Sequence, residues 1–412
     1  MIARFFLVPV LFFSLLTPVR AEWPQCGTVN AWPGAEWPQA DPGRWNRDLL
    51  RQARALSRSQ DAGAAVMVVY RGHLVARWGD IAEPRLVQSV RKQLLSSLVG
   101  LEVKAGRLHL DDTLADLGVN DTRPPLTPAE RKATLRDLLE SRSGIFHSAH
   151  YEVGGWRRLR EKLRRQEEES GKADAIPPGK LWIYNNWDFN TVGDIVEQSA
   201  DRPIGPYFRQ AIADPLGMQD FRADDVEYTG DGSLSAWMLG NHSIHPAYAF
   251  RISARDLARY GVLWLGCGQW NGQQVLPASW VLESTRGRDT LDGADPNGIQ
   301  KDFGYFGYLW WVDRDHRRRN PDLPGDLDVY YASGAGGHRL YVFPSLDLVI
   351  AHEVDTPGGV GTFSQIWRRL FDDARLDDAQ VAAVVDLILA AHPERQSIGR
   401  GTDSKPDQGR TH

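Results

Sequence analysis

The chain has 412 residues, of which 42% are hydrophobic and 25% are charged, and its formal net charge is −5. This composition allows a sizeable buried core and excludes a chain that is disordered throughout. Acidic and basic residues are interspersed over most of the length, so we expect no nucleic-acid partner. No repeat period or second composition regime divides the interior, which favours one folded unit with an inserted subdomain.

Residues 1–21 have the pattern of a signal peptide: an early positive charge, a short apolar run and a small-residue cleavage site after Ala21. We expect an exported protein, periplasmic or secreted, without stable membrane insertion, because no later stretch is apolar enough to span a bilayer. The lead segment 22–45 contains Cys26, and the other cysteine is Cys267. Export permits a disulfide between them, and two separate thiols are the alternative.

The hydrophobic pattern predicts a definite order of elements. Helical periodicity covers 46–59, and two strands follow around a turn at 70–73. Helical and loop patterns then dominate from 89 to about 320, and strand character returns only over 330–354. Strands at both ends of the chain favour an α+β fold, with one antiparallel sheet flanked by helices and an inserted, mostly helical lobe.

These patterns also give approximate boundaries. We place the folded domain at 46–392 and its helical lobe at about 110–250. An amphipathic helix is expected from about Ser364. The polar residues 393–412 are expected to form a disordered tail.

Ser89 and Lys92 form the only Ser-x-x-Lys sequence in the chain, at the start of a stretch with helical periodicity, 88–106. Residues three apart share a helix face, so the Lys92 amine can reach the Ser89 hydroxyl. Burial lowers the pKa of a lysine, and a neutral Lys92 could take the Ser89 proton. Backbone N–H groups at the helix start could stabilise an oxyanion. A helix-capping serine beside a solvated lysine is the alternative.

Tyr184 and Asn186 belong to the only Tyr-x-Asn sequence, which we expect to lie in a loop. If Tyr184 faces Ser89, its phenolic oxygen can pass a proton to a leaving group. Asn186 can donate an amide hydrogen bond to Lys92 or to a substrate carbonyl. Simple packing of Tyr184 with its tryptophan neighbours is the alternative.

A run of small residues, 332–337, lies immediately before a predicted strand. It includes Ser333, Gly334 and Ala335. Small residues permit close approach of the backbone to a ligand, so an N–H here could complete an oxyanion hole with that of Ser89. An ordinary tight turn is the alternative.

The order of these motifs resembles that of the serine β-lactamase and penicillin-binding protein fold. The stretches LVQSVRKQLLSSLVGLEVKAGRLHLDD, WIYNNWDFNTVGDIVE and YYASGAGGHRLYVFPSLDLVI are similar to the branch with class C β-lactamases, esterases and 6-aminohexanoate-dimer hydrolases. The resemblance covers about 45 to 380. It implies Ser89 as the acylated nucleophile, Lys92 as its base, Tyr184 as proton shuttle, Asn186 as a positioning group and the Ala335 N–H as an oxyanion donor.

Two departures from the family pattern bear on the substrate. Ala332, Ser333 and Gly334 stand where β-lactamases and carboxypeptidases have Lys-Thr-Gly, so the cation that binds a substrate carboxylate is missing. Ser333 retains a hydroxyl for a substrate carbonyl or amide. Arg142 stands in the segment that resembles the family's His-Thr-Ser-Gly, where we leave its role open. Most of a set of large aromatic residues are expected in the core rather than lining a cleft: Trp182, Trp187, Phe306, Trp310 and Trp311.

The sequence therefore predicts an exported serine hydrolase that cleaves a small ester, amide or linear oligoamide through an acyl-Ser89 intermediate. The partner is a small-molecule acyl substrate, and the oligomeric state is left open. We expect no cofactor and no metal, because the 11 histidines are scattered without ligand spacing. A D,D-peptidase or β-lactamase is one alternative, and a non-catalytic binding or sensor protein of the same fold is another.

Overall fold

The structure is a computed structural model that describes residues 23–41, 43–122, 124–151, 162–163, 165, 176–229, 243–293, 302–315, 323, 327–355 and 378–395. The predicted signal peptide and the predicted helix start at Ser364 lie outside these residues. Residues 393–395 of the predicted disordered tail are described and form a helical turn, and the remainder of that tail lies outside. In the described ranges, no helix has the length and apolar character needed to cross a membrane.

One antiparallel sheet of eight strands forms the centre of the described structure. Its spatial order is β2-β1-β13-β12-β11-β10-β9-β8. The strands are β1 Ala65–Tyr70, β2 His73–Trp78, β8 Arg288–Asp289, β9 Tyr305–Phe306, β10 Trp311–Asp313, β11 Val329–Gly334, β12 His338–Phe343 and β13 Leu348–Glu353. The first strand pairs with the last one, Ala65 opposite Glu353, which confirms that strands from both ends of the chain share one sheet.

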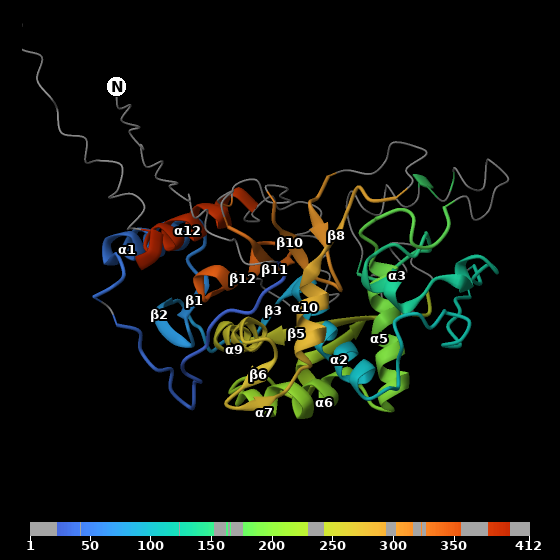
Figure 1. Ribbon diagram of the computed structural model, residues 1–412, viewed down its shortest axis with the longest axis horizontal. Helices are drawn as coiled ribbons and strands as arrows, with labels where there is room; N and C mark the ends of the chain where they lie inside the picture. The colour runs from blue at the N-terminus through green and yellow to red at the C-terminus, as the bar shows by residue number, and fades with distance from the viewer. Residues whose placement is uncertain are drawn as a thin grey trace, which may run out of the picture.

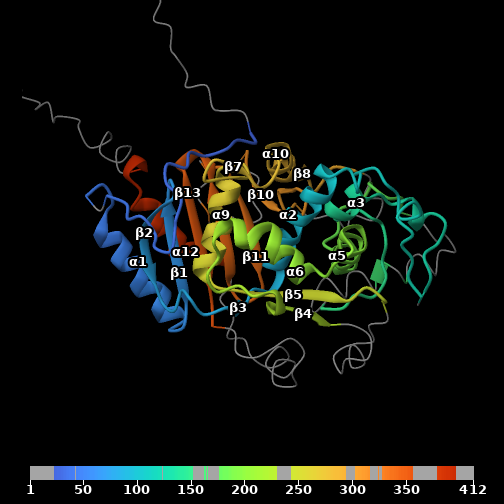
Figure 2. The ribbon, with the colours of Figure 1, turned by 90° about the horizontal axis from the view of Figure 1, so that it is seen from below.

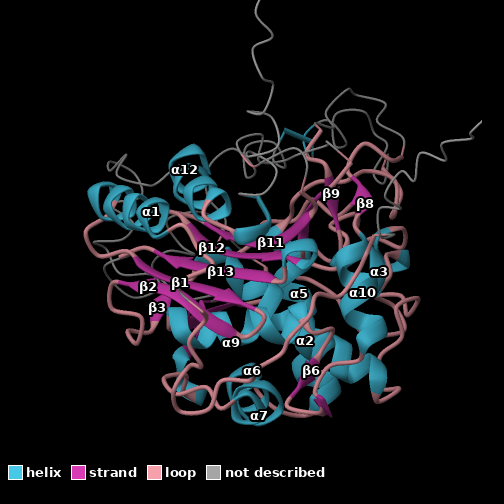
Figure 3. Ribbon diagram, turned by 60° about the vertical axis from the view of Figure 1, so that its left-hand side comes forward, coloured by secondary structure: helices cyan, strands magenta, loops and turns pink. Residues whose placement is uncertain are grey.

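Helices cover both faces of this sheet (Figure 3). Helices α1 (Arg47–Gln60) and α12 (Asp378–Ala390) pack together on one face. Helix α9 (Ala254–Leu265) packs on the other face against β1, β12 and β13. A Cβ on Gly261 of α9 would lie 2.5 Å from the side chain of Val349, so a glycine is needed for this close approach. With both faces covered, every residue of β1 is buried.

The remaining helices form a lobe beside the sheet (Figure 1). Its main elements are α2 Arg91–Lys104, α3 Leu135–Leu139, α5 Asn186–Ala200 and α6 Ile204–Phe208, with α7 Asp214–Leu216 and α10 Ala278–Arg286 at its border. Helix α2 is buried around most of its circumference, as expected for a central helix. Its buried Ser96 hydroxyl donates to the carbonyl of Tyr308, so the polar group keeps a partner.

The expectation that strands return only near the C-terminus was wrong. Strand β5 (Ala247–Ile252) lies between β3 (Arg85–Leu86) and β4 (Val226–Thr229) in a second sheet (Figure 2). Strands β8, β9 and β10 extend the main sheet, and β6 (Gln269–Trp270) pairs with β7 (Gln273–Gln274). Most of these strands have only two or three residues, which is too few for a period-two pattern to appear in the sequence.

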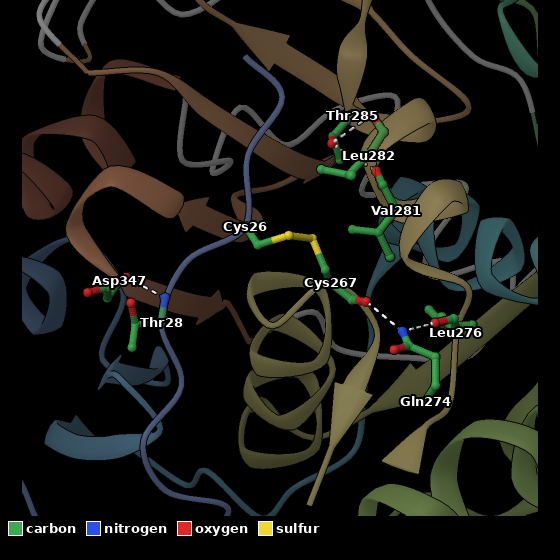
Figure 4. The surroundings of a disulfide bond; sticks show 9 residues. All are labelled: Cys26, Thr28, Cys267, Gln274, Leu276, Val281, Leu282, Thr285 and Asp347. Atoms are coloured by element: carbon green, nitrogen blue, oxygen red, sulfur yellow. Dashed lines mark hydrogen bonds between the residues drawn. A yellow bond between two sulfur atoms is a disulfide. The ribbon is translucent and has the colours of Figure 1, made fainter. Parts of the chain in front are cut away.

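The lead segment is attached to the body by a disulfide between Cys26 and Cys267 (Figure 4). The Gly27 N–H donates to the carbonyl of Leu265 at 2.9 Å, and the segment then runs beside β2, where Gln39 forms a parallel bridge with Leu74. This contact covers the outer edge of β2, which would otherwise offer unpaired backbone groups to another chain. Of the two sequence alternatives for the cysteines, the bridge is the one formed.

Candidate active site

Ser89 lies on a tight turn that leads into α2. The turn is a 3₁₀ helix, Gln88–Val90, and Ser89 itself is half-buried. Gln88 has φ of 52°, a left-handed conformation that is uncommon for a residue with a side chain. Its side-chain oxygen accepts a hydrogen bond of 2.5 Å from the hydroxyl of Tyr151. A contact from the lobe therefore supports the strained residue that immediately precedes Ser89.

The Lys92 amine lies between the two hydroxyl groups expected to act with it. Its Nζ donates to Ser89 Oγ at 2.8 Å and to Tyr184 Oη at 2.5 Å. Lys92 is 1% exposed, and Nζ lies 4.6 Å from the centre of the Tyr184 ring and 4.9 Å from that of Phe189. The fold therefore brings the three predicted groups into one hydrogen-bonded line, although Tyr184 is 92 residues from Lys92.

Tyr184 is held by its neighbours on both sides in the chain. The carbonyl of Ile183 accepts from the Ser141 hydroxyl at 2.6 Å, and the N–H of Asn185 donates to the same hydroxyl at 3.1 Å. The Tyr184 ring stacks on Trp311 of β10, with 5.6 Å between ring centres and 16° between planes. The loop position predicted for Tyr184 is thus confirmed, and the ring is fixed by the sheet.

Asn186 is the first residue of α5 and is buried close to this line. Its side-chain N–H donates to the carbonyl of Tyr151 at 3.2 Å, a partner that the sequence did not indicate. Its buried Oδ1 accepts no hydrogen bond from the residues that the structure describes. Asn186 therefore keeps one free acceptor near the three catalytic candidates, and its substrate contact stays a prediction.

Gly334 at the end of β11 brings the small-residue run against the Ser89 turn. A Cβ at Gly334 would lie 2.4 Å from the carbonyl oxygen of Val87, the residue before the turn. Ala335 follows at the surface, Ser333 is half-buried, and Ala332 is completely buried. The small residues thus permit a backbone approach between β11 and the Ser89 turn. The close approach to a ligand and the oxyanion role of the Ala335 N–H stay predictions.

Arg142 does not supply a free cation. Its guanidinium donates to the carbonyls of Asp292, at 2.5 Å, and Asp289. Burial lowers the pKa of Arg142 to about 10. Arg142 therefore ties the loop after α3 to the segment at β8. The large aromatic residues singled out in the sequence are all buried, which confirms the expectation of a core position: Trp182, Trp187, Phe306, Trp310 and Trp311.

Several polar residues near the site had no sequence signal. Arg91, beside Lys92, is fully buried and donates to Asn190 at 2.8 Å, and its guanidinium lies 4.3 Å from the centre of the Tyr248 ring. Asp188 accepts from Ser143 at 2.6 Å, and burial raises its pKa well above the ordinary value. These partners come from segments distant in the sequence, so no local motif could have indicated them. Among the described residues, no group of His, Cys, Asp or Glu could hold a metal ion.

The comparison with known proteins agrees with this geometry. A family model for β-lactamase matches residues 47–374. The chain belongs to the β-lactamase family. A curated relative, an uncharacterized protein of Alkalihalophilus pseudofirmus, is 22% identical over 329 residues, which are 74% of this chain and 87% of the relative.

Solved structures of the β-lactamase family and its neighbours share the fold. A putative β-lactamase from Bacteroides dorei has a TM-score of 0.56 at 14% identity, over 85% of this chain and 99% of that one. A putative 6-aminohexanoate-dimer hydrolase from Bacillus anthracis has a TM-score of 0.52 at 18% identity, over 85% and 89%. A penicillin-binding protein homologue from Caulobacter crescentus has a TM-score of 0.53 at 15% identity, over 84% and 98%. At these identities the likeness shows the α+β fold.

Proposed function

We propose that the protein is a serine hydrolase that cleaves a small ester, amide or linear oligoamide through an acyl-Ser89 intermediate. The observation that carries the proposal is the position of Lys92 Nζ, within hydrogen-bond distance of both Ser89 Oγ and Tyr184 Oη. A serine is activated as a nucleophile when a base lies within hydrogen-bond distance of it and a third group contacts that base. The family assignment supports the same reading.

Acylation follows from the order of these groups. A neutral Lys92 takes the proton from Ser89 Oγ as that oxygen attacks the substrate carbonyl carbon. The oxyanion of the tetrahedral intermediate accepts hydrogen bonds from the N–H groups of Ser89 and Ala335. As the bond to the leaving amine or alcohol breaks, Tyr184 donates its proton to the leaving group and regains a proton from Lys92.

Deacylation runs through the same groups in reverse. A water molecule gives its proton to Lys92, either directly or through Tyr184, which accepts the water proton as it passes its own to Lys92, and attacks the acyl carbon. The oxyanion forms again in the same position, and Ser89 leaves with a proton from Lys92. The acid product departs, and no proton is gained or lost by the site over one turnover.

The substrate class is inferred from whether the two positions singled out in the sequence supply a cation. Ala332 is buried and uncharged, and Arg142 is bound to backbone carbonyls, so neither supplies a cation for a substrate carboxylate. This favours an uncharged ester or amide over a penicillin or a cell-wall peptide. Among proteins of the same fold, one is titled a putative 6-aminohexanoate-dimer hydrolase and another, EstCE1, a hydrolase with promiscuous acyltransferase activity.

We further propose that the protein is exported and that cleavage after Ala21 removes the signal peptide. The disulfide between Cys26 and Cys267 supports this location, since such bonds persist mainly in oxidising compartments. Fractionation of cells that express the full chain, with the mature N-terminus sequenced, tests the proposal. A mature chain beginning at Glu22 outside the cytoplasm is expected, and an uncleaved cytoplasmic chain would contradict export.

The catalytic proposal is tested by hydrolysis of a short-chain p-nitrophenyl ester by the mature protein, with nitrocefin as a parallel substrate. Ser89→Ala is expected to abolish ester turnover while the fold is retained. Ser97→Ala is the control, because Ser97 lies buried in α2, the helix that follows the Ser89 turn, and its hydroxyl donates to the Leu94 carbonyl. Undiminished ester hydrolysis in Ser89→Ala would falsify the mechanism. Nitrocefin turnover comparable with ester turnover would favour a β-lactamase. A ligand-induced rise in melting temperature without any product or adduct would favour a binding protein.

A further inference from the structure

The turn that carries Ala335 is closed by a backbone hydrogen bond, from the Gly337 N–H to the Gly334 carbonyl at 3.3 Å, and by a shorter contact from the side chain of Arg339 to the same carbonyl. Residues 335–337 connect β11 to β12, and Arg339 is the second residue of β12. Its Nη1 donates to the carbonyl of Gly334 at 2.7 Å and to the carbonyl of His338 at 2.8 Å. One guanidinium nitrogen of Arg339, a residue that is 4% exposed, therefore binds the residue on each side of this turn.

Two further contacts hold the same assembly. The second guanidinium nitrogen of Arg339 pairs with the carboxylate of Asp378, the first residue of α12. His352, which lies opposite Arg339 on β13, bonds the carbonyl of Gly337 through Nδ1 at 2.9 Å. Since a carbonyl only accepts, this ring nitrogen carries the proton. The turn is thus fixed at Gly334 and at Gly337 by side chains of two neighbouring strands.

The contact with Gly334 has a direct effect on Ala335. A peptide unit is planar and trans, so the C=O of Gly334 and the N–H of Ala335 lie in one plane and point in opposite directions. A donor that fixes the carbonyl oxygen therefore fixes the direction of the N–H. Stabilisation of an oxyanion depends on a donor that is already aimed at the developing charge, because reorientation during the reaction costs free energy.

We propose that Arg339 is a positioning residue for the oxyanion hole, acting by holding the Gly334–Ala335 peptide in the orientation that catalysis needs. The inference rests on the proposed function, in which Ala335 supplies one oxyanion donor. Asp378 holds Arg339 in turn, so the start of α12 becomes part of the support of the active site. A planar guanidinium suits this role because it can bind carbonyls and a carboxylate at once, whereas a lysine offers a single point charge.

The test compares Arg339→Gln, Arg339→Lys and Asp378→Asn with wild type. Active sites are counted from the acyl-enzyme burst, so that kcat refers to folded enzyme. Arg339→Gln is expected to lower kcat for a p-nitrophenyl ester by roughly 10- to 100-fold, because the Ala335 N–H no longer points at the oxyanion of the transition state. KM should stay within about twofold, because the contacts of the bound substrate before reaction are unchanged. The affinity of this variant for phenylboronic acid, which forms a tetrahedral adduct on a serine, should fall by a similar factor.

Arg339→Lys should recover part of the loss, and Asp378→Asn should show a smaller loss in the same direction. The Asp378 side chain is 38% exposed, so Asp378→Asn should fold. This variant can therefore test the proposal even if Arg339→Gln does not fold. The control is Arg71→Gln, which removes another ion-paired arginine. Arg71 lies at the β1–β2 turn, is half-buried and pairs with Asp347, which lies between β12 and β13. The control variant should alter the melting temperature and leave kcat and boronate affinity unchanged.

Two results would overturn the role of Arg339. The first is that the folded Arg339 and Asp378 variants keep kcat and boronate affinity within twofold of the wild-type values. The other is a loss of the same size in Arg71→Gln. A wild-type enzyme without any Ser89-dependent turnover is a different outcome, because it contradicts the proposed function itself.

Discussion

Gly334 and Val87 lie so close together that a Cβ on Gly334 would stand 2.4 Å from the Val87 carbonyl oxygen. The two residues belong to different halves of the proposed site, since Val87 precedes the turn with Ser89 and Gly334 precedes Ala335. Their contact sets the distance between Ser89, the proposed nucleophile, and the end of β11, after which Ala335 is the proposed second oxyanion donor. Backbone atoms form the contact on the Val87 side, so it cannot relax by a side-chain rotation.

Gly334→Ala should therefore disrupt catalysis more than stability. The added methyl group must push β11 away from the Ser89 turn, and a displacement of about 1 Å at a catalytic group can cost about 100-fold in rate. We expect kcat for ester hydrolysis to fall by at least about tenfold in protein that still folds. Gly34→Ala is the control, because a Cβ there meets no atom within 4 Å. Unchanged kcat in Gly334→Ala would show that the approach of β11 is not part of the site.

Tyr184→Phe isolates the hydroxyl that contacts Lys92. The ring can stay stacked on Trp311, so the melting temperature should change little. Loss of the proton donor should lower kcat by about 10²- to 10⁴-fold. The double variant with Lys92→Met should lose far less than the product of the two single losses, since the two groups act as one unit. Independent, multiplicative losses would contradict the shared proton path. Tyr207→Phe serves as the tyrosine control, because the Tyr207 hydroxyl donates to Glu102.

The disulfide should contribute to stability and not to catalysis. Cys26 and Cys267 are 241 residues apart in the sequence, so the bridge restricts a large part of the unfolded chain. Cys26→Ser with Cys267→Ser should lower the free energy of unfolding by about 2–5 kcal/mol. Dithiothreitol should lower the stability of wild type and leave the double variant unaffected. Equal stability of the two proteins under oxidising conditions would mean that hydrogen bonds alone hold the lead segment.

His147 gives a pH dependence of stability with a defined sign. The ring lies 3.4 Å from Asp121 and 3.3 Å from Glu130, and despite the opposing effect of burial these carboxylates raise its pKa to about 9. The folded state thus binds the proton more tightly than the unfolded state, whose histidine has a pKa of about 6.5. The stabilisation is complete below pH 6.5 and is lost as the pH rises through about 9.

The measurement is the free energy of unfolding of wild type and His147→Gln at pH 6 and pH 10. The difference between the two proteins should shrink by about 2–3 kcal/mol at the higher pH. Subtraction of the variant removes the effect of other groups. The buried His338 and His352, whose pKa values burial lowers to about 3 and about 4, act mainly below pH 6.5 and do not interfere. A pH-independent difference would exclude a charged His147 in the folded state.

The sequence predicted elements whose contacting residues lie close together in the chain, and it did not predict contacts between distant residues. The helix at Asn46–Ser59, the hairpin at 65–78 and the strand character over 330–354 were predicted and are confirmed, because each has a local pattern of several residues. Strand β10, with three residues, was not predicted, although it carries Trp311 against Tyr184. The sequence likewise did not predict the contact of Tyr151 with Gln88 or the contacts of Arg339 with Gly334 and Asp378.

By itself, the sequence determined which chemistry the chain can offer. Ser89 and Lys92 are three residues apart at a helix start, so helix geometry alone brings them together. Tyr184 could be named as their third partner only from the order of motifs. Tertiary structure decided that Tyr184 Oη lies 2.5 Å from Lys92 Nζ, that Arg142 is bound to carbonyls and that Cys26 meets Cys267. The physical reason is that periodicity and spacing encode contacts within one turn or hairpin, whereas packing across the sheet and the lobe sets the distances between groups far apart in the chain.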